Sequence, residues 1–299
     1  MVVGLVGCGS WGRHILRDLV SLGCEVPVVA RSPESIARAE KGGAAKVVGE
    51  VGSLPTLDGV VVATTTSTHA AVVGKLLELG VSIFCEKPLT DDPAAAVRLA
   101  EKAPDRLFVM DKWRYHPGVL ELAAIARERR LGRVAGITTV RIGWGNPHDD
   151  VDPVWVLAPH DLSISLEVMG SVPRPESAVA QTLNGQIVRL SAFLGGAGWW
   201  HAFEVSARSP ERTRRIELHC DEGVAVLAGG WDEHVSVFRE GADGPEETRI
   251  ETPGELPLLA ELRVFVEHLA GGPAPKSSAA EGAAIVAALA ELRRLAGSR

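Results

Sequence analysis

Residues 2–12 read VVGLVGCGSWG, in which an apolar run of strand length meets glycines spaced G-x-G-x-x-G. Residues 13–22 follow with helical periodicity, which predicts the order strand, tight turn, helix. The apolar residues that share one face of this helix are Ile15, Leu16, Leu19 and Val20.

The glycine spacing predicts a loop that binds a dinucleotide. Gly7 allows the turn, Gly9 lets the backbone approach a pyrophosphate, and Gly12 lets helix and strand pack closely, with the phosphates at the helix N-terminus. Because the motif follows a strand and precedes a helix, we expect it to hold a cofactor, together with Ser10 and Trp11. The alternative is a glycine-rich turn that binds nothing.

Length and composition narrow the class of protein. A chain of 299 residues predicts two domains, and 46% hydrophobic residues indicate an ordinary globular protein. The net charge of -7 and the lack of a basic run argue against nucleic-acid binding. No stretch predicts a signal peptide, a membrane span or a metal site, and the four cysteines are scattered. We expect a cytoplasmic protein with reduced thiols.

Strand and helix patterns alternate through the first third of the chain. The alternation predicts a doubly wound parallel sheet of the Rossmann type over residues 1–112. The further strands are predicted at 25–30, 46–48, 59–63, 81–85 and 106–110. Helices are predicted at 33–41 and 93–102, and a third helix follows the 59–63 strand and ends at residue 79.

The end of the second predicted strand bears on the choice of cofactor. A carboxylate there would take the ribose hydroxyls of NAD(H), but the chain has Ala30, Arg31 and Ser32 instead. Arg31 can hold a 2′-phosphate as a bidentate fork, and Ser32 can add a hydrogen bond. We therefore predict NADP(H) in preference to NAD(H). The alternative is that Arg31 is an ordinary surface arginine.

Hydroxyl residues follow the strand predicted at 59–63. Thr64, Thr65 and Thr66 lie where parallel sheets bind ligands, so they are candidates for the cofactor's ribose and diphosphate, with His69 close behind. Helix capping by the next hydroxyl residues is the alternative explanation.

The strand predicted at 81–85 ends in Glu86-Lys87-Pro88. A lysine at the carboxyl end of a parallel strand favours a catalytic role over a structural one. Its ammonium group can polarise a carbonyl or donate a proton as hydride arrives.

Residues 7–12, 63–69 and 86–88 together resemble the Gfo/Idh/MocA family of nicotinamide-dependent oxidoreductases. The resemblance implies a Rossmann domain followed by an α/β domain with a large open, mainly antiparallel sheet, which often serves dimer contact. It also implies that Lys87 lies at the substrate and that the Lys87–Pro88 peptide bond is cis. Glu86 and Lys87 are further candidates for contact with the cofactor. Thr65 departs from the family, in which many members have proline.

The second half of the chain, 113–299, is predicted to form the domain that binds substrate and mediates a homodimer or homotetramer. A helix is expected at 117–130, a strand at 134–142, further strands from 177 to 239, and helices at 256–269 and 279–295. Residues 241–255 are predicted to be a mobile acidic loop. The loop 143–153, which contains Trp144, Asn146, His148, Asp149 and Asp150, is either a ligand loop or a solvated connection.

Residues 154–162, VWVLAPHDL, resemble a family signature in which an Asp precedes the His by four residues. His160 fits the pattern, but the position of the Asp holds Val156. Valine cannot orient an imidazole or raise its basicity, so alcohol oxidation should suffer more than reduction of a carbonyl. Pro159 is expected to bend or start a helix. Tyr115, Trp155 and Val156 complete the candidate substrate-binding residues.

The chain is thus predicted to be an NADP(H)-dependent oxidoreductase that reduces a carbonyl of a sugar-like or nucleotide-sugar metabolite. Lys87 is the polarising acid and His160 a proton donor. An imine reductase is the alternative within the same class, and a non-catalytic nucleotide-binding regulatory protein the alternative outside it. A lyase or glycosidase that recycles its bound nicotinamide is a further possibility.

Overall fold

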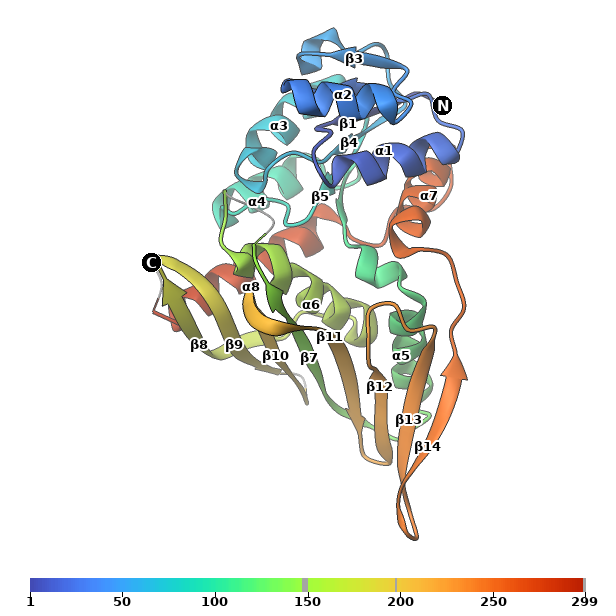
Figure 1. Cartoon of the computed structure of the whole chain (residues 1–299), viewed down its shortest axis with the longest axis vertical. Helices are drawn as coiled ribbons and strands as arrows, with labels where there is room; N and C mark the ends of the chain where they lie inside the picture. Colours follow the sequence, from blue (N-terminus) through green and yellow to red (C-terminus); the bar gives the residue numbers. More distant parts are fainter. Residues whose placement is uncertain (147–149, 197, 298–299) are drawn as a thin grey trace. The chain divides into compact units, whose positions relative to one another are not determined.

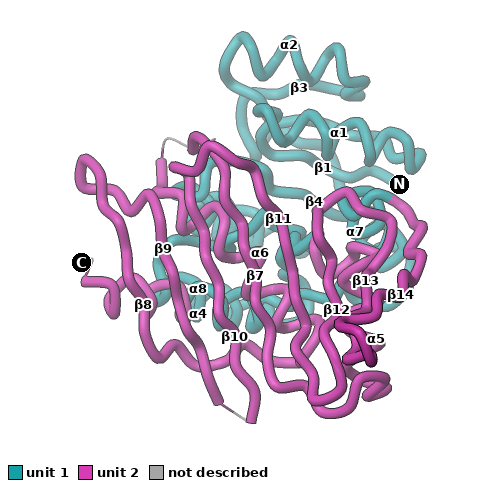
Figure 2. Tube along the Cα trace, turned by 60° about the horizontal axis from the view of Figure 1, so that its bottom comes forward, with its two compact units in different colours: residues 1–112, 256–286 teal, residues 113–255, 287–299 magenta. Residues whose placement is uncertain are grey.

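The computed structural model describes residues 1–146, 150–196 and 198–297. Within it the chain forms two compact units, coloured separately in Figure 2. Unit 1 contains residues 1–112 and 256–286, and unit 2 contains residues 113–255 and 287–299. Each unit has its own sheet and its own hydrophobic core.

Unit 1 is built on a six-stranded parallel sheet in the order β3-β2-β1-β4-β5-β6. Its strands and helices alternate along the chain, as the sequence predicts (Figure 1). The strands are β1 Val3–Val6, β2 Pro27–Val29, β3 Lys46–Val48, β4 Gly59–Val62, β5 Ser82–Glu86 and β6 Leu107–Met110. The helices are α1 Gly12–Ser21, α2 Pro33–Lys41, α3 His69–Leu76 and α4 Pro93–Lys102. Strand order reverses between β1 and β4, which is where doubly wound sheets bind ligands.

Unit 1 is completed by residues from the end of the chain, which the sequence-based division 1–112 and 113–299 assigns to the second domain. Helix α7, Pro257–Leu269, packs against α1, and its Phe265 stacks on Phe84 of β5 with ring centroids 4.9 Å apart. The apolar face of α7 therefore belongs to the core of unit 1. Helix α8, Ala279–Leu295, is divided between the units after Val286.

Unit 2 is built on an eight-stranded sheet in the order β14-β13-β12-β11-β7-β10-β9-β8. Only the pair β7 and β10 is parallel, which confirms the mainly antiparallel sheet. The strands are β7 Val134–Trp144, β8 Arg174–Leu183, β9 Gln186–Gly196, β10 Trp199–Ser206, β11 Arg208–Cys220, β12 Gly223–Leu227, β13 His234–Gly241 and β14 Gly244–Glu251. Helices α5, Pro117–Glu128, and α6, Pro153–Met169, contact this sheet.

The prediction of a mobile acidic loop at 241–255 is wrong, because most of it is strand β14. This strand pairs with β13 along its whole length, from Gly241↔Gly244 to His234↔Glu251. The acidic side chains obscure the strand pattern in the sequence. One of them, Glu247, accepts a hydrogen bond from Ser236 of β13 at 2.8 Å and from Arg249 of its own strand at 3.0 Å. Cross-strand pairs of this kind stabilise an exposed edge strand.

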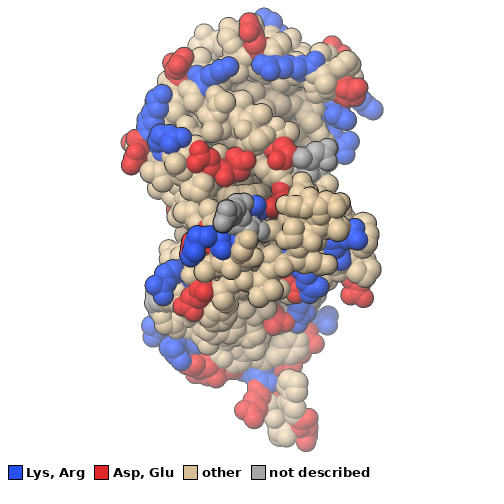
Figure 3. All heavy atoms as spheres, turned by 90° about the vertical axis from the view of Figure 1, so that its left-hand side faces the viewer, with Lys and Arg blue, Asp and Glu red and all other residues tan. Residues whose placement is uncertain are grey.

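The surface carries both signs of charge. On the face shown in Figure 3, lysine and arginine side chains are interspersed with aspartate and glutamate. None of the described helices combines the length and apolar character needed to cross a lipid bilayer.

Helix α7 also buries a carboxyl group in unit 1. Glu261 is 1% exposed, and its Oε2 has no hydrogen-bond partner among the described residues. Burial raises the pKa of Glu261 well above its ordinary value, the carboxylates of Glu86 and Asp111 raise it further, and Lys112 opposes them. A buried acid facing other carboxylates keeps its proton because the charged form is poorly solvated.

Glu261→Gln should make the stability of the protein less dependent on pH. Because the pKa of Glu261 is higher in the folded than in the unfolded chain, the folded state binds more protons, and stability falls as pH rises above the ordinary carboxyl value. This loss is at most about 1.4 kcal/mol for each pH unit across that window. Urea unfolding at pH 5 and pH 8 measures it. Equal pH dependence in both proteins would contradict the prediction.

Candidate active site

The loop after β1 has the backbone that its glycines predict. Gly7 has a φ of +98°, and a Cβ added to it would lie 2.5 Å from the carbonyl oxygen of Ala63. An added Cβ at Gly12 would clash with the carbonyl oxygen of Gly7, whereas one at Gly9 would meet nothing within 4 Å. The loop is therefore closed where it packs on protein and open at Gly9, where a pyrophosphate is expected to approach.

The start of α1 suits an anion. The helix has no acidic residue in its first turn, and the side chain of its N-cap residue Trp11 makes no capping hydrogen bond. The amides of Arg13 and His14 donate to the carbonyl oxygens of Gly9 and Trp11, and the helix dipole favours negative charge at this end of α1. These features, together with the open space at Gly9, fit the phosphates of a dinucleotide.

Trp11 connects the glycine loop to the Glu-Lys-Pro loop. Its indole Nε1 donates a hydrogen bond to Oε1 of Glu86, whose Oε2 accepts one from the backbone amide of Lys87 at 3.1 Å. Nζ of Lys112 lies 4.2 Å from the centre of the Trp11 ring. Sequence reasoning selected Trp11 and Glu86 separately but missed both their hydrogen bond and Lys112, because residues so far apart in the chain give no pairing signal.

A histidine joins the threonine loop to the Glu-Lys-Pro loop. The ring of His69 is 1% exposed, with Nδ1 2.9 Å from the carbonyl oxygen of Pro88 and Nε2 3.1 Å from that of Thr64. Burial lowers the pKa of His69, although the two carbonyl groups oppose the effect. Both ring nitrogens face protein, so the structure places His69 as a brace between two loops that flank the candidate cofactor site.

The threonines differ in exposure. Thr66 is buried, Thr65 is exposed, and Thr64 is intermediate. The hydroxyl of Thr68 donates to Oγ1 of Thr64 at 2.8 Å and lies at the same distance from the carbonyl oxygen of Thr65. The cap residue of the following helix makes no side-chain capping bond, so its hydroxyl holds the loop rather than the helix end.

Lys87 stands directly after β5, as the sequence predicts. The Lys87–Pro88 peptide bond is cis, which confirms the expectation from the family resemblance. The neighbouring Cys85 is fully buried, and burial raises the pKa of its thiol well above the ordinary value, so this thiol is inert.

Arg31 and Ser32 lie together at the start of α2. Arg31 is exposed, and its Nε donates to the carbonyl oxygen of Gly49 at 3.1 Å. Ser32 is the N-cap of α2 and accepts a hydrogen bond from the amide of Ser35 at 3.2 Å. The pKa of the exposed Glu34 is lowered by its own backbone amide and by the Ser32 hydroxyl. A 2′-phosphate at Ser32 would therefore meet Glu34 as well as Arg31.

In unit 2, helix α6 carries the residues of the family signature. It begins at Pro153 with Asp152 as its N-cap, and Pro159 lies inside it, so of the two expectations for Pro159, a bend or a helix start, the helix start is wrong. Val156, 5% exposed, and His160 are four residues apart in this helix and so share one face. Asp152, at the helix start, pairs with Arg293 of α8, which lies 5.7 Å from the ring centre of the buried Trp155.

Trp113 connects His160 to a second histidine and to an arginine. The Trp113 ring lies 6.5 Å from the His160 ring at an interplanar angle of 58°, and it stacks on His116 at 5.1 Å and 11°. Arg141 of β7 covers the same indole, with its Cζ 4.4 Å from the ring centre. Tyr115, in the 3₁₀ turn Lys112–Tyr115, is 7% exposed.

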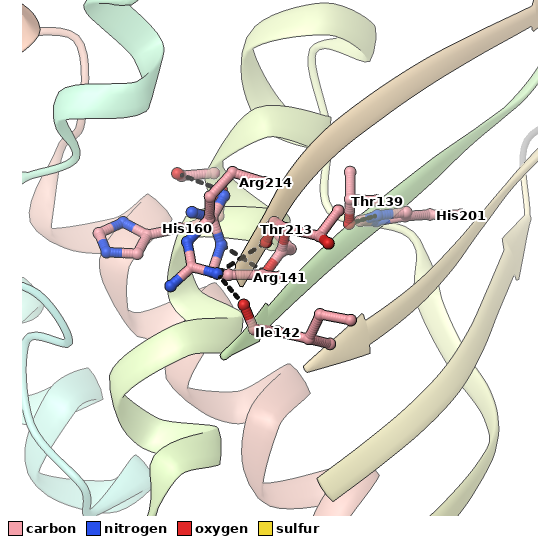
Figure 4. A network of polar contacts seen from close by, with 9 residues as sticks. Thr139, Arg141, Ile142, His160, His201, Thr213 and Arg214 are labelled. Carbon is pink, nitrogen blue, oxygen red and sulfur yellow. Dashed lines mark hydrogen bonds and ion pairs between the residues drawn. The ribbon is translucent and has the colours of Figure 1, made fainter. Parts of the chain in front are cut away.

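Polar groups fill the interface between α6 and the sheet (Figure 4). Asp161 accepts a hydrogen bond from Nε of Arg141 at 3.0 Å, and both side chains are buried. His201 of β10 lies 2.7 Å from the hydroxyl of Ser165 and 3.0 Å from that of Thr139. Burial lowers the pKa of His201 to about 3, so its ring is neutral. Sequence reasoning missed this network, whose residues look like ordinary strand and helix positions.

The loop at 143–153 is only partly described. Residues 147–149, which include the candidates His148 and Asp149, lie outside the described residues. Trp144 is 68% exposed, with the guanidinium carbon of Arg208 4.6 Å from its ring centre. Nδ2 of Asn146 donates to the carbonyl oxygen of Val151 at 2.8 Å.

Comparisons with curated proteins find sugar and inositol dehydrogenases. The chain is 35% identical over 141 residues to the myo-inositol dehydrogenase Hyg17 of Streptomyces leeuwenhoekii, an alignment that covers 45% of this chain and 43% of that protein. It is 29% identical over 252 residues to inositol 2-dehydrogenase 2 of Saccharopolyspora erythraea, with 73% of each chain covered. The chain thus spans less than half the length of the first of these relatives.

Solved structures share the fold along nearly the whole chain. UDP-N-acetylglucosamine 3-dehydrogenase GnnA from Acidithiobacillus ferrooxidans superposes with a TM-score of 0.85 at 21% identity, covering 99% of this chain and 97% of that one. Levoglucosan dehydrogenase, in complex with NADH and levoglucosan, gives a TM-score of 0.88 at 16% identity with the same coverage. Residues 1–109 match the family described as "Oxidoreductase family, NAD-binding Rossmann fold". The match to this family, the Gfo/Idh/MocA oxidoreductases, thus lies in residues 1–109, and the solved structures extend the shared fold to the rest of the chain.

Proposed function

We propose that this protein is an NADP(H)-dependent oxidoreductase that reduces a carbonyl of a sugar-like or nucleotide-sugar metabolite by hydride transfer. The observation that carries the proposal is the hydrogen-bonded link from Trp11 in the glycine loop through Glu86 to the amide of Lys87. It ties a phosphate-binding loop to a lysine at the mouth of β5 within one unit. Several relatives named as dehydrogenases of inositol, UDP-N-acetylglucosamine and D-apiose support the substrate class.

The residues divide the chemistry between them. A bound nicotinamide would supply the hydride. Lys87 donates a hydrogen bond from Nζ to the acceptor oxygen and stabilises the negative charge that develops there. His160 is the proposed proton donor as the alcohol forms.

Val156 favours reduction as the working direction. It takes the place of the carboxylate that would turn His160 into a stronger base, and it lies on the same helix face. Proton removal from an alcohol needs such a base, whereas proton donation to a carbonyl can come from a cationic lysine. Val156 equally supports an imine reductase, because a C=N acceptor needs only a proton and a hydride. Val156 also supports an alternative without catalysis, in which the protein binds a nucleotide and has a regulatory role.

We also propose a homodimer or homotetramer. On the sheet of unit 2, Trp200 stacks on Phe193 with ring centroids 6.2 Å apart, and the Phe193 side chain is 38% exposed. Aromatic residues on an exposed sheet face suit a contact between subunits.

Lys87→Ala should lower kcat about 100-fold or more while the affinity for NADPH changes little, because the variant loses the group that polarises the acceptor. Turnover of keto sugars is followed by the loss of NADPH absorbance, and cofactor binding by calorimetry. Lys75→Ala, at an exposed position of α3, is the control. Near-normal turnover by Lys87→Ala with cofactor bound would defeat the mechanism.

Arg31→Ala should raise KM for NADPH about 10-fold and leave KM for NADH unchanged, because only the 2′-phosphate uses the guanidinium. Glu34→Gln should lower KM for NADPH, since it removes a negative charge beside Ser32. Lys41→Ala, at the other end of α2, is the control. An unaltered protein that prefers NADH would refute the proposed cofactor preference.

In the reduction, kcat/KM should fall as pH rises and His160 loses its proton. Val156→Asp should move this fall to higher pH by about one unit, because a carboxylate on the same helix face favours the imidazolium form of His160. Val156→Asn, which adds a polar group of the same size without a charge, should leave the fall in place. A fall that stays at the same pH in both variants would show that His160 does not move the proton.

A further inference from the structure

Two arginines in unit 2 share one carboxylate near His160. Arg141 and Asp161 form a buried ion pair, with Nε and Oδ2 3.0 Å apart. Arg214 of β11 is close enough to Arg141 for each to repel the other's charge, and Asp161 is the carboxylate that offsets this repulsion. One carboxylate, that of Asp161, thus acts on two guanidinium groups.

Arg214 is held by only one of its three nitrogens. Its Nη1 donates to the carbonyl oxygens of Ile142 at 2.5 Å and Thr213 at 2.7 Å, and the close-up shows both bonds (Figure 4). Among the described residues, Nε and Nη2 have no protein partner. These two nitrogens form the edge of a guanidinium that binds a carboxylate or phosphate with two parallel hydrogen bonds.

The surroundings place Arg214 beside Trp113, the aromatic neighbour of His160. A Cβ added to Gly230 would lie 2.9 Å from the Trp113 ring and 3.4 Å from Cβ of Arg214, so the three residues pack together. The same Trp113 faces His160 and carries Arg141 on its ring. Trp113 is therefore the common neighbour of Arg141, Arg214 and His160.

The electrostatics agree with this geometry. The pKa of Arg214 is lowered to about 10, first by burial and then by Arg141 and Arg212, while Asp161 acts in the opposite sense. A half-buried arginine whose charge is disfavoured by its surroundings gains most from an anion that enters beside it. Val156 adds to the imbalance, because valine occupies the helix position four residues before His160 where a carboxylate would supply negative charge.

We propose that Arg214, supported by Arg141, binds an anionic substituent of the acceptor, so that the substrate is a sugar acid or a sugar phosphate rather than a neutral polyol. This inference rests on the proposed function, because it concerns the acceptor side of the same reaction. A carboxylate or a phosphate oxygen pair on the sugar would take the Nε and Nη2 hydrogens of Arg214. The substrate itself would then supply the negative charge that Val156 lacks.

Matched pairs of ligands test the proposal by calorimetry on the NADPH-saturated protein. D-galacturonate is compared with D-galactose for the carboxylate, and D-glucose 6-phosphate with D-glucose for the phosphate. At least one anion should bind about 10- to 100-fold more tightly than its neutral partner, as expected for a gained charge-assisted hydrogen bond. The pair that shows the preference identifies the anion, and equal affinities in both pairs would overturn the proposal.

Variants then locate the site. Arg214→Gln should abolish the preference, whereas Arg215→Gln, on the next position of β11 and paired with Glu217, should keep it. Arg214→Lys keeps the positive charge but cannot donate two parallel hydrogen bonds, so it should retain only part of the preference. It also tests the site if Arg214→Gln does not fold. A full preference in a folded Arg214→Gln or in Arg214→Lys would overturn the assignment.

The two proposals can fail separately. Binding of NADPH is measured by calorimetry on the same samples without sugar, and the sugar titrations are repeated without NADPH. Anion preference without nucleotide binding would defeat the oxidoreductase and leave the anion site standing. Nucleotide binding and turnover of neutral sugars, with no anion preference, would defeat the anion site alone.

Discussion

The site in unit 1 depends on the carboxylate of Glu86. Its two oxygens receive the indole N–H of Trp11 and the amide of Lys87, so one buried group fixes two loops that are 75 residues apart in the chain. His69 does the same on the other side, between Thr64 and Pro88. A carboxylate that accepts hydrogen bonds at both oxygens loses little by burial, and the loops gain the rigidity that a reaction centre needs.

The fold of unit 1 could be predicted from the sequence because its signals are local. The glycine spacing, the apolar strands and the prolines at helix starts set α2, β3 and α4 to the residue. The membership of α7 in this unit could not be predicted, since it depends on Phe265 meeting Phe84 across 181 residues. Strand β14 was hidden for another reason, because most of its residues are polar or charged and do not alternate with apolar ones.

The candidate site was predictable in its motifs and unpredictable in its contacts. Lys87 and His160 could be chosen because they stand in recognisable patterns, Lys87 at the end of β5 and His160 within the signature on α6. Arg141, Arg214 and the buried His201 gave no such signal, because an arginine or histidine in a strand reads as a solvated or structural residue. Only the tertiary structure shows that Arg141 and Asp161 are buried together and that Trp113 is a common neighbour of Arg141 and His160.

The late arrival of α7 has a consequence for biosynthesis. The ribosome delivers β1 to β6 first, yet Phe84, Ile15 and Leu19 lack the helix that covers them until residues 257–269 have been made. The first sheet must therefore wait, with an uncovered apolar surface, while the whole of the second sheet is synthesised. A nascent chain in that state is open to misassociation until the last helices dock on unit 1.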